Sequence, residues 1–217
     1  MGSEIRLIVF DFDGVLVDGR QVVELARRAG VHEKVERLIR QWEESASSPS
    51  PYHHEGVSLL KGLTYSDATD VAENLPIMPG AEEVVRTLKD HGLKAAVITN
   101  GYYVTTRKLV KKLGIDYVFA NELLFENGVA TGKMVEQIGD ATAKAQALDR
   151  VVSLEGITLN QCIVVGDGVN DLLMMKKAGL GIAFNGDYRL RQVAEIVDGK
   201  DLRRILPYVL ARVYEKR

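Results

Sequence analysis

The sequence predicts an α/β fold, in which a doubly wound parallel sheet carries a small α-helical insertion directly after its first strand. The apolar run over 7–10 is typical of a strand that is buried on both faces. From residue 80 onwards, strand-like and helix-like segments alternate, as in a parallel sheet covered by helices on both sides. Between these two parts, residues 19–76 show only helical periodicity. We therefore expect one core, formed by 1–18 and 77–217, and one helical module, formed by 19–76.

The helical module is expected to contain four helices. Apolar residues spaced at i, i+3, i+4 and i+7 indicate the helices, and Gly30 is a typical residue for ending the first of them. A loop rich in Ser and Pro follows the second helix over 45–51. The expected helices cover 20–30, 32–46, 56–63 and 65–74.

The core continues with alternating elements after residue 80. Short apolar runs predict the strands, and amphipathic segments between them predict the helices. The Asn-Gly pair at 127–128 is a strong signal for a tight turn and predicts a hairpin over 123–135. The remaining strands are expected over 93–98, 117–120, 162–165, 180–184 and 196–197, and the helices over 80–91, 102–113, 140–155, 170–178 and 202–213.

Composition excludes several classes of function. The 217 residues are 46% hydrophobic and 27% charged, which is typical of a globular protein with a substantial core. The formal net charge of −2 and the lack of a long basic run argue against a nucleic-acid partner. No apolar run approaches the ~18 residues of a membrane span, and no signal peptide is recognisable, so we expect a cytoplasmic protein. The single cysteine, Cys162, excludes an intrachain disulfide and is expected to be a buried thiol.

Two carboxylates follow the first strand. Asp11 and Asp13 stand where the chain leaves the sheet, and open α/β sheets bind ligands at this end of their strands. Two acidic side chains so close together repel each other unless a cation lies between them, and an all-oxygen site suits Mg²⁺. One carboxylate could attack a phosphoryl group while the other moves protons. The alternative is that both residues only cap a turn.

Polar residues also follow the second strand of the core. Thr99, Asn100 and Gly101 combine a hydroxyl, an amide and a glycine just before a helix, which is an arrangement that can bind phosphate. An ordinary helix cap would have the same composition.

A third cluster follows the strand over 162–165. Asp167 stands at the expected strand end, where it could complete a metal site, and Asn170 and Asp171 follow in the first turn of a helix. Lys144 lies in the preceding helix, where a lysine is usually solvated. It becomes a candidate for the same site only if the fold places it beside Asp11 and Asp171.

The order of these motifs resembles the haloacid dehalogenase superfamily of phosphatases, and within it the phosphoserine phosphatases. The matching stretches extend over essentially the whole chain, and the helical module is similar to the cap that this superfamily inserts after its first strand. The resemblance is carried by Asp-x-Asp at 11–13, Thr-Asn-Gly at 99–101, Lys144, Gly-Asp-Gly-x-Asn-Asp at 166–171, and further similar stretches at 57–61, 120–121, 154–157, 176–180 and 182–184.

The resemblance implies a Mg²⁺-dependent hydrolase that acts on a small phosphomonoester through an aspartyl-phosphate. Asp11 would be the nucleophile, and Asp13 would be the general acid and base. Asp11, the backbone carbonyl of Asp13 and Asp167 would bind the metal. Thr99, the Asn100 amide and Lys144 would bind the phosphoryl oxygens, and Gly101 and Asn170 would be further phosphate- or substrate-binding residues. Asp171 would orient Lys144 and a metal-bound water.

Three positions depart from the phosphoserine phosphatases. Val15 replaces a common Thr, Arg20 replaces the glutamate that contacts the substrate ammonium, and Gly56 replaces the arginine that binds the substrate carboxylate. Arg20 could instead bind a second anionic group of the substrate. A surface pair with Glu24 is the alternative for Arg20, and Glu24 itself could read an ammonium in an authentic phosphoserine phosphatase.

Other functions remain open from the sequence. A phosphomutase could use the same aspartate, and a phospho-accepting receiver domain also uses aspartates at strand ends. The physiological substrate and the oligomeric state are not indicated.

Overall fold

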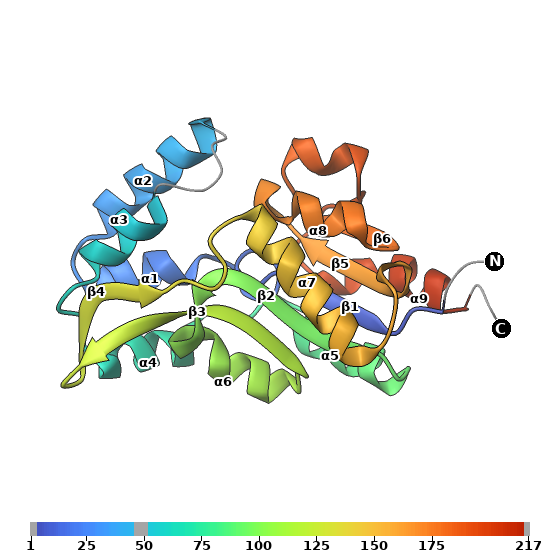
Figure 1. Cartoon of the computed structure of the whole chain (residues 1–217), viewed down its shortest axis with the longest axis horizontal. Helices are drawn as coiled ribbons and strands as arrows, with labels where there is room; N and C mark the ends of the chain where they lie inside the picture. The colour runs from blue at the N-terminus through green and yellow to red at the C-terminus, as the bar shows by residue number, and fades with distance from the viewer. Residues whose placement is uncertain (1–3, 46–51, 215–217) are drawn as a thin grey trace.

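The computed structural model describes residues 4–45 and 52–214 and has the predicted α/β architecture (Figure 1). In these residues the sheet has seven strands in the order β4-β3-β2-β1-β5-β6-β7, all parallel except β4. The strands are β1 Leu7–Phe10, β2 Lys94–Tyr102, β3 Tyr117–Glu126, β4 Val129–Val135, β5 Cys162–Gly166, β6 Leu180–Phe184 and β7 Glu195–Val197. The α-helices are α1 Gln21–Arg28, α2 His32–Ser45, α3 Tyr52–Leu59, α4 Tyr65–Asn74, α5 Ala81–Asp90, α6 Tyr103–Leu113, α7 Ala141–Glu155, α8 Leu172–Lys177 and α9 Leu206–Tyr214.

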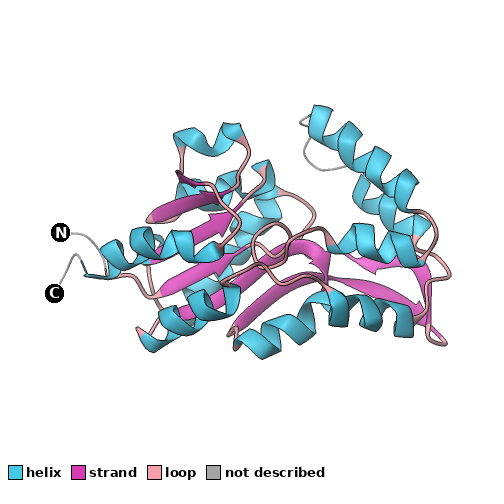
Figure 2. Cartoon of the chain, turned by 180° about the vertical axis from the view of Figure 1, so that it is seen from behind, coloured by secondary structure: helices cyan, strands magenta, loops and turns pink. Residues whose placement is uncertain are grey.

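The central strand β1 is buried on both faces, as its apolar run predicts. Ile8 and Phe10 belong to the hydrophobic cluster that includes α5, α6 and α9, whereas Leu7 and Val9 belong to the cluster that includes α7 and α8. Figures 1 and 2 show these two sets of helices on opposite faces of the sheet. The alternation of strand side chains thus places helices on both faces.

The helices α1–α4 lie at one end of the sheet, next to the β3–β4 hairpin (Figure 1). The hairpin connects to them through backbone hydrogen bonds from Gly62 N to Ala130 O, from Ala130 N to Leu63 O and from Tyr65 N to Gly128 O. Buried residues of α1, α2 and α4 also belong to the same hydrophobic cluster as Phe10 of β1. The helical module and this face of the sheet therefore share one continuous apolar core.

Several element bounds differ from those expected. β2 does not end at residue 98 but continues irregularly to Tyr102, which pairs with Asn121 of β3. β3 is one strand and not two segments, because the polar side chain of Asn121 is hydrogen-bonded within the fold and does not interrupt the strand. α3 begins and ends about four residues earlier than expected. The loop expected over 45–51 lies almost entirely outside the described residues.

Short 3-10 turns account for the other differences. The helix expected over 170–178 is a turn at Val169–Asp171 followed by α8, and the helix expected from 202 is a turn at Leu202–Ile205 followed by α9. A further turn at Tyr188–Gln192 was not predicted. The turn at 127–128 and the edge strand β7 are present as predicted.

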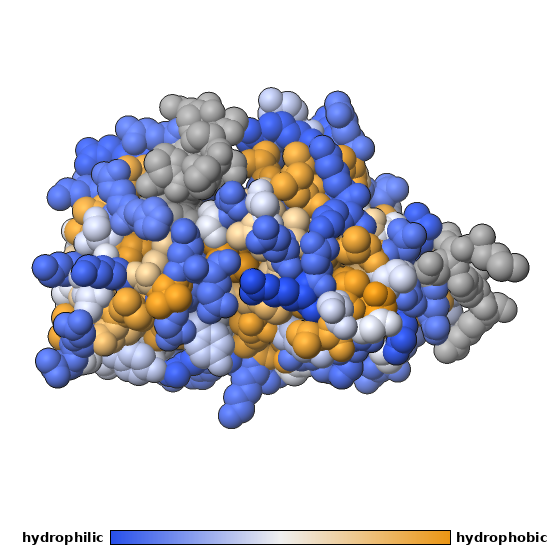
Figure 3. Space-filling model, viewed as in Figure 1, coloured by the Kyte–Doolittle hydropathy of each residue, from blue (hydrophilic) through white to orange (hydrophobic). Residues whose placement is uncertain are grey.

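The molecular surface is mixed in character. Figure 3 shows hydrophobic residues in several separate groups, interrupted by hydrophilic residues, on the face seen in Figure 1. The apolar side chains that are most exposed, such as Leu154 and Tyr188, belong to different elements. No helix among the described residues is both long enough and apolar enough to cross a bilayer.

Candidate active site

The register of the central strands brings the predicted motifs to one edge of the sheet. Phe10 pairs with Val97 of β2 on one side and with Val165 of β5 on the other. The residues that follow these three positions are therefore neighbours in space. Asp11 comes directly after β1, where its backbone N–H donates to Val165 O at 2.9 Å.

Asp11 is nearly fully buried, and its carboxylate has two defined contacts. Oδ1 accepts a 2.7 Å hydrogen bond from the backbone N–H of Phe12, and Oδ2 lies 2.9 Å from Lys144 Nζ. Burial raises the pKa of Asp11 to about 7, against the lowering effect of Lys144. The two contacts fix the plane of the carboxylate at the strand tip.

Lys144 is a fully buried cation that joins two of the motifs. Its Nζ lies 2.9 Å from Asp11 Oδ2 and 2.8 Å from Asp171 Oδ1, and its side chain has no exposed surface. Burial alone would lower the pKa of Lys144, but attraction to the two carboxylates raises it above its usual value. Asp140 caps the start of α7 by accepting from Ala143 N, and thereby sets the first helical turn from which Lys144 extends.

Asp167 and Asp171 bring further negative charge to Lys144 and Asp11. Side-chain oxygens of Asp11, Asp167 and Asp171 lie within 4.8 Å of one another. Asp171 is held in place because its Oδ2 accepts from the backbone N–H groups of Asp167 and Gly168, each at 3.1 Å. Burial and the carboxylates of Asp11 and Asp171 raise the pKa of Asp167 well above its usual range.

This carboxylate cluster fits a divalent cation of the Mg²⁺ type. Its donors are hard oxygen atoms, and the mutual repulsion of Asp11, Asp167 and Asp171 is the condition that a bound cation relieves. The turn after Asp13 also passes close to this cluster. Gly14 has a φ of +75°, and a Cβ atom there would lie 2.1 Å from Asp167 Oδ2. The close approach of this turn to Asp167 therefore requires a glycine.

The Asp13 side chain is held by the first residue of α1. Its Oδ1 accepts from Gln21 N at 3.0 Å, and its Oδ2 accepts from Gln21 Nε2 at 3.3 Å. Burial raises the pKa of Asp13 to about 6, and the two bonds from Gln21 oppose that rise. Sequence reasoning missed Gln21. The available signal was a polar residue on the face of α1 that otherwise carries Val22, Leu25 and Ala26.

The motif at 99–101 lies in the irregular end of β2. Thr99 is buried, and its Oγ1 accepts from Gly101 N at 3.0 Å. The side chain of Asn100 donates to Ile138 O at 2.9 Å and accepts from Asn170 Nδ2 at 2.7 Å. Asn100 and Asn170, which were predicted from different motifs, are thus in direct contact.

Asn121 is a second buried polar residue that sequence reasoning missed. Its amide donates to the backbone oxygens of Asn100 and Ile138, and its Oδ1 accepts from the N–H groups of Gln137 and Ile138. The side chain supports the segment from which Asn100 reaches the site. The signals in the sequence were its position directly after the apolar run over 117–120 and the similarity of 120–121 to the phosphoserine phosphatases.

Arg20 stands just before α1, at the border of this site. Its side chain is exposed, and its positive charge opposes the burial that raises the pKa values of Asp13 and Asp167. Gly56 is buried within α3 and has no side chain to offer a ligand. Glu24 Oε1 lies 3.6 Å from Arg27 Nε, in an exposed ion pair on α1.

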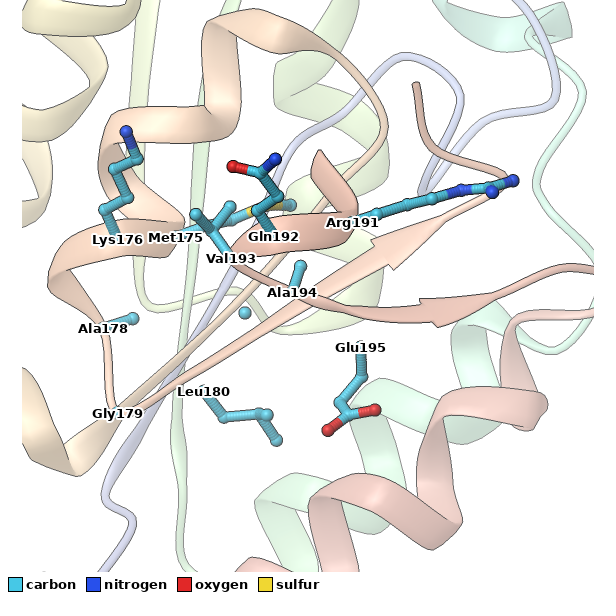
Figure 4. Close-up of a pocket in the computed structure, with 11 residues that line it drawn as sticks. Met175, Lys176, Ala178, Gly179, Leu180, Arg191, Gln192, Val193, Ala194 and Glu195 are labelled. Carbon is cyan, nitrogen blue, oxygen red and sulfur yellow. The ribbon is translucent and has the colours of Figure 1, made fainter. Parts of the chain in front are cut away.

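A separate hollow of about 540 Å³ lies between α8, β6 and β7 (Figure 4). Its lining includes Met175, Lys176, Arg191 and Glu195, and none of the predicted site residues is among the residues that line it. The hollow is therefore separate from the strand-end cluster, where the predicted residues converge.

Comparisons with known proteins agree with this geometry. A family model described as haloacid dehalogenase-like hydrolase matches residues 5–179. A phosphoserine phosphatase from Methanocaldococcus jannaschii is 37% identical over 210 residues, which cover 96% of this chain and the whole relative. Another from Archaeoglobus fulgidus is 41% identical over 192 residues, but the aligned part spans only 56% of that longer protein.

Solved structures give the same result. A substrate-bound phosphoserine phosphatase complex superimposes with a TM-score of 0.89 at 36% identity and covers 95% of this chain and 99% of that structure. A phospho-aspartyl intermediate analogue of phosphoserine phosphatase also has a TM-score of 0.89, at 37% identity. The chain belongs to the haloacid dehalogenase-like hydrolases and is a phosphatase that resembles the phosphoserine phosphatases.

Proposed function

We propose that the protein hydrolyses a small organic phosphomonoester with the help of Mg²⁺ and forms an aspartyl-phosphate on Asp11. The observation that carries this proposal is the buried Lys144, which lies within 3 Å of both Asp11 and Asp171 in a cluster of three carboxylates. Phosphoryl transfer depends mainly on positioning and on neutralising charge, and this cluster is arranged for both. The substrate is a small molecule, and we expect neither a nucleic-acid partner nor a location outside the cytoplasm.

In the first step, Asp11 attacks the phosphorus atom. A bond forms between a carboxylate oxygen of Asp11 and phosphorus, while the bond to the leaving oxygen breaks. Asp13 enters this step protonated and gives its proton to the leaving oxygen, so that a neutral alcohol departs. Asp11 attacks as the carboxylate, and the positive charge of Lys144 beside it favours that ionised form against the burial that raises its pKa.

In the second step, water releases the phosphate. Asp13, now a carboxylate, takes a proton from a water molecule as its oxygen attacks the phosphorus atom. The bond between Asp11 and phosphorus breaks, inorganic phosphate leaves, and Asp13 is protonated again. The cycle therefore balances with one water consumed for each ester cleaved.

The other residues hold the phosphoryl group and the cation. Asp11, Asp167 and the backbone carbonyl of Asp13 would bind Mg²⁺, which supplies positive charge at the phosphoryl oxygens when it is bound. Thr99, the Asn100 amide and Lys144 would contact the phosphoryl oxygens beside Gly101. Asp171 would orient Lys144 through its 2.8 Å contact, and Asn170 would hold Asn100.

The substrate class follows from Arg20 and Gly56. A phosphoserine ammonium would meet the guanidinium of Arg20 in place of a carboxylate, and Gly56 offers no cation for the substrate carboxylate. We therefore propose a substrate with a second anionic group and no amine. The identity to phosphoserine phosphatases supports a second candidate, an authentic phosphoserine phosphatase, but the pairing of Glu24 with Arg27 gives Glu24 an alternative to contact with an ammonium. The hydrolase family model and the phosphoserine phosphatases named above favour a phosphatase over a phosphomutase or a receiver domain.

A panel of phosphomonoesters tests both parts of this proposal. We expect Mg²⁺-dependent release of phosphate from para-nitrophenyl phosphate, and loss of this activity in Asp11→Asn. We also expect a higher kcat/KM for phosphoglycolate than for phosphoserine, with the preference reduced in Arg20→Glu. If the wild type prefers phosphoserine tenfold or more, the proposal of an amine-free anionic substrate is wrong. The second candidate, an authentic phosphoserine phosphatase, then takes its place.

A further inference from the structure

Gln21 is a fully buried polar residue that lies between Asp13 and the end of β2. Its backbone N–H and its Nε2 donate to the two carboxylate oxygens of Asp13, at 3.0 and 3.3 Å. Its Oε1 accepts from the backbone N–H of Tyr102 at 2.9 Å and is also in hydrogen-bond contact with the hydroxyl of Thr105. One side chain thus connects Asp13 to both β2 and α6.

These contacts determine which way the amide of Gln21 faces. A backbone N–H can only donate, so the amide atom that lies against Tyr102 N must be the oxygen Oε1. The NH₂ group is then directed at Asp13 Oδ2, where it donates. The contact with the backbone N–H of Tyr102, and not Asp13 itself, therefore determines that Gln21 presents its NH₂ group to Asp13.

Gly101 leaves the space that Gln21 occupies. A Cβ atom at residue 101 would lie 1.8 Å from Gln21 Nε2 and 2.2 Å from its amide carbon. No side chain can be accommodated there while Gln21 keeps its position. Gly101, predicted as part of a phosphate-binding motif, is also the residue that allows Gln21 to reach Asp13.

We infer that Gln21 is a positioning residue for the reaction: it holds the Asp13 carboxyl group in the orientation from which it transfers protons. This inference rests on the proposed function, because it assigns Gln21 a role only if Asp13 is the general acid and base. Both oxygens of Asp13 receive an N–H from the same residue, so rotation of the carboxyl group would break at least one of these bonds. Catalytic groups held in this way transfer protons more efficiently than freely rotating ones.

The competing explanation is that Gln21 only satisfies buried polar groups. The buried N–H of Tyr102 needs a partner, and Gln21 provides it, whereas the hydroxyl of Thr105 also contacts the backbone oxygen of Tyr102 at 2.8 Å. A purely structural role would change stability, but it would affect all substrates alike. A role in positioning Asp13 would depend on how much the leaving group needs a proton.

Gln21→Met removes the amide and keeps the length of the side chain. Thr105→Val removes one anchor of Oε1 and leaves Gln21 in place, so it supplies a milder variant if the first is unstable. Gln161→Met is the matched control, because Gln161 lies beside the opposite end of β5, where its amide donates to Glu4 O. Thermal unfolding of each variant establishes the folded fraction.

The probes are aryl phosphates of similar size, from para-nitrophenyl phosphate, whose leaving group is stable as an anion, to phenyl phosphate, whose leaving group requires a proton. In Gln21→Met we expect kcat/KM to fall about tenfold or more for phenyl phosphate and less than threefold for para-nitrophenyl phosphate. This loss of kcat/KM should be smaller than the loss caused by removing the Asp13 carboxyl group, because the backbone N–H of residue 21 still donates to Oδ1 of Asp13. Thr105→Val should shift the ratio in the same direction, and Gln161→Met should leave it unchanged.

Two further readouts separate positioning from structure. Asp13 also activates the water in the second step, so Gln21→Met should show a burst of para-nitrophenol followed by a slower steady state. In an Asp13→Asn background, the additional substitution Gln21→Met should lower kcat/KM by less than about twofold, because no proton-transferring group is left to position.

An equal loss of kcat/KM for both esters would overturn the role of Gln21, as would a drop in stability with unchanged kinetics. Failure of the proposed function is recognised separately, because the wild type would then release no phosphate from para-nitrophenyl phosphate, or Asp11→Asn would remain active.

Discussion

At the scale of single residues, the candidate site depends on Lys144, a buried lysine whose charge is not solvated by water. Lys144 lies between Asp11 and Asp171, and removal of a single member of a buried, charged network leaves the others uncompensated. From the sequence, Lys144 was a candidate only on the condition that the fold places it beside Asp11 and Asp171, because most lysines on helices are solvated. Its contacts come from the packing of α7 beside β2, α8 and the turn at Val169–Asp171, which is not a local property of the sequence.

Lys144→Ala should lower kcat/KM by on the order of 10² or more, because it deletes a preorganised positive charge beside the phosphoryl group. Steady-state hydrolysis of para-nitrophenyl phosphate, corrected for the folded fraction, measures this loss. Lys177→Ala is the matched control, since Lys177 also pairs with an aspartate, Asp149, but in a partly exposed position. A loss below about threefold in Lys144→Ala would remove Lys144 from the machinery.

At the scale of elements, the β3–β4 hairpin supports the junction between α3 and α4. The turn residues Asn127 and Gly128 have φ values of +50° and +77°, which is the left-handed conformation that a two-residue hairpin requires. Gly128 O accepts from Tyr65 N at the start of α4. Formation of this turn therefore affects both the hairpin and the helix that packs beside it.

Gly128→Ala should lower the free energy of unfolding by about 1–2 kcal/mol, because a Cβ atom is disfavoured at this φ. Denaturant titration measures the change. Asn127→Gly serves as the control and should change stability by no more than a few tenths of a kcal/mol, since glycine adopts the same conformation easily. Equal stability of Gly128→Ala and the wild type would mean that the turn does not limit the stability of the hairpin.

The strands and the turn at 127–128 were predictable because their signals are local: apolar runs, alternation and an Asn-Gly pair. The extension of β2 through Thr99, Asn100 and Gly101 was not, because it depends on pairing with Asn121, about twenty residues further along the chain. Gln21 was missed for the same reason. Its partners are Asp13 on one side and Tyr102 and Thr105 on the other, and no local pattern connects them.

At the scale of the whole molecule, a modest net charge of −2 conceals a concentration of negative charge at one end of the sheet. Asp11, Asp167 and Asp171 converge there, and Asp13 lies near enough to raise the pKa of Asp11. Lys144 offsets only part of this charge. The fold is thus expected to be least stable at the site where it is proposed to bind Mg²⁺.

Mg²⁺ should raise the melting temperature of the wild type, because a ligand that binds only the folded state stabilises it by about 2.7 kcal/mol at 100 times its Kd. Asp167→Asn should abolish most of this effect and should be more stable than the wild type in the presence of a chelator, since it relieves repulsion with Asp11 and Asp171. Thermal unfolding with and without Mg²⁺ tests both effects. An equal response to Mg²⁺ in the variant would show that Asp167 does not bind the cation.

Acid quenching of the reaction within one turnover, followed by fragmentation of the peptides in a mass spectrometer, locates the covalent phosphoryl group most directly. With para-nitrophenyl phosphate as substrate, the phosphoryl group should be on Asp11, not on the nearby Asp13, and should be absent from quenched Asp11→Asn. Turnover by the wild type without phosphorylation of Asp11, or undiminished turnover by Asp11→Asn, would contradict catalysis through an aspartyl-phosphate at the end of β1.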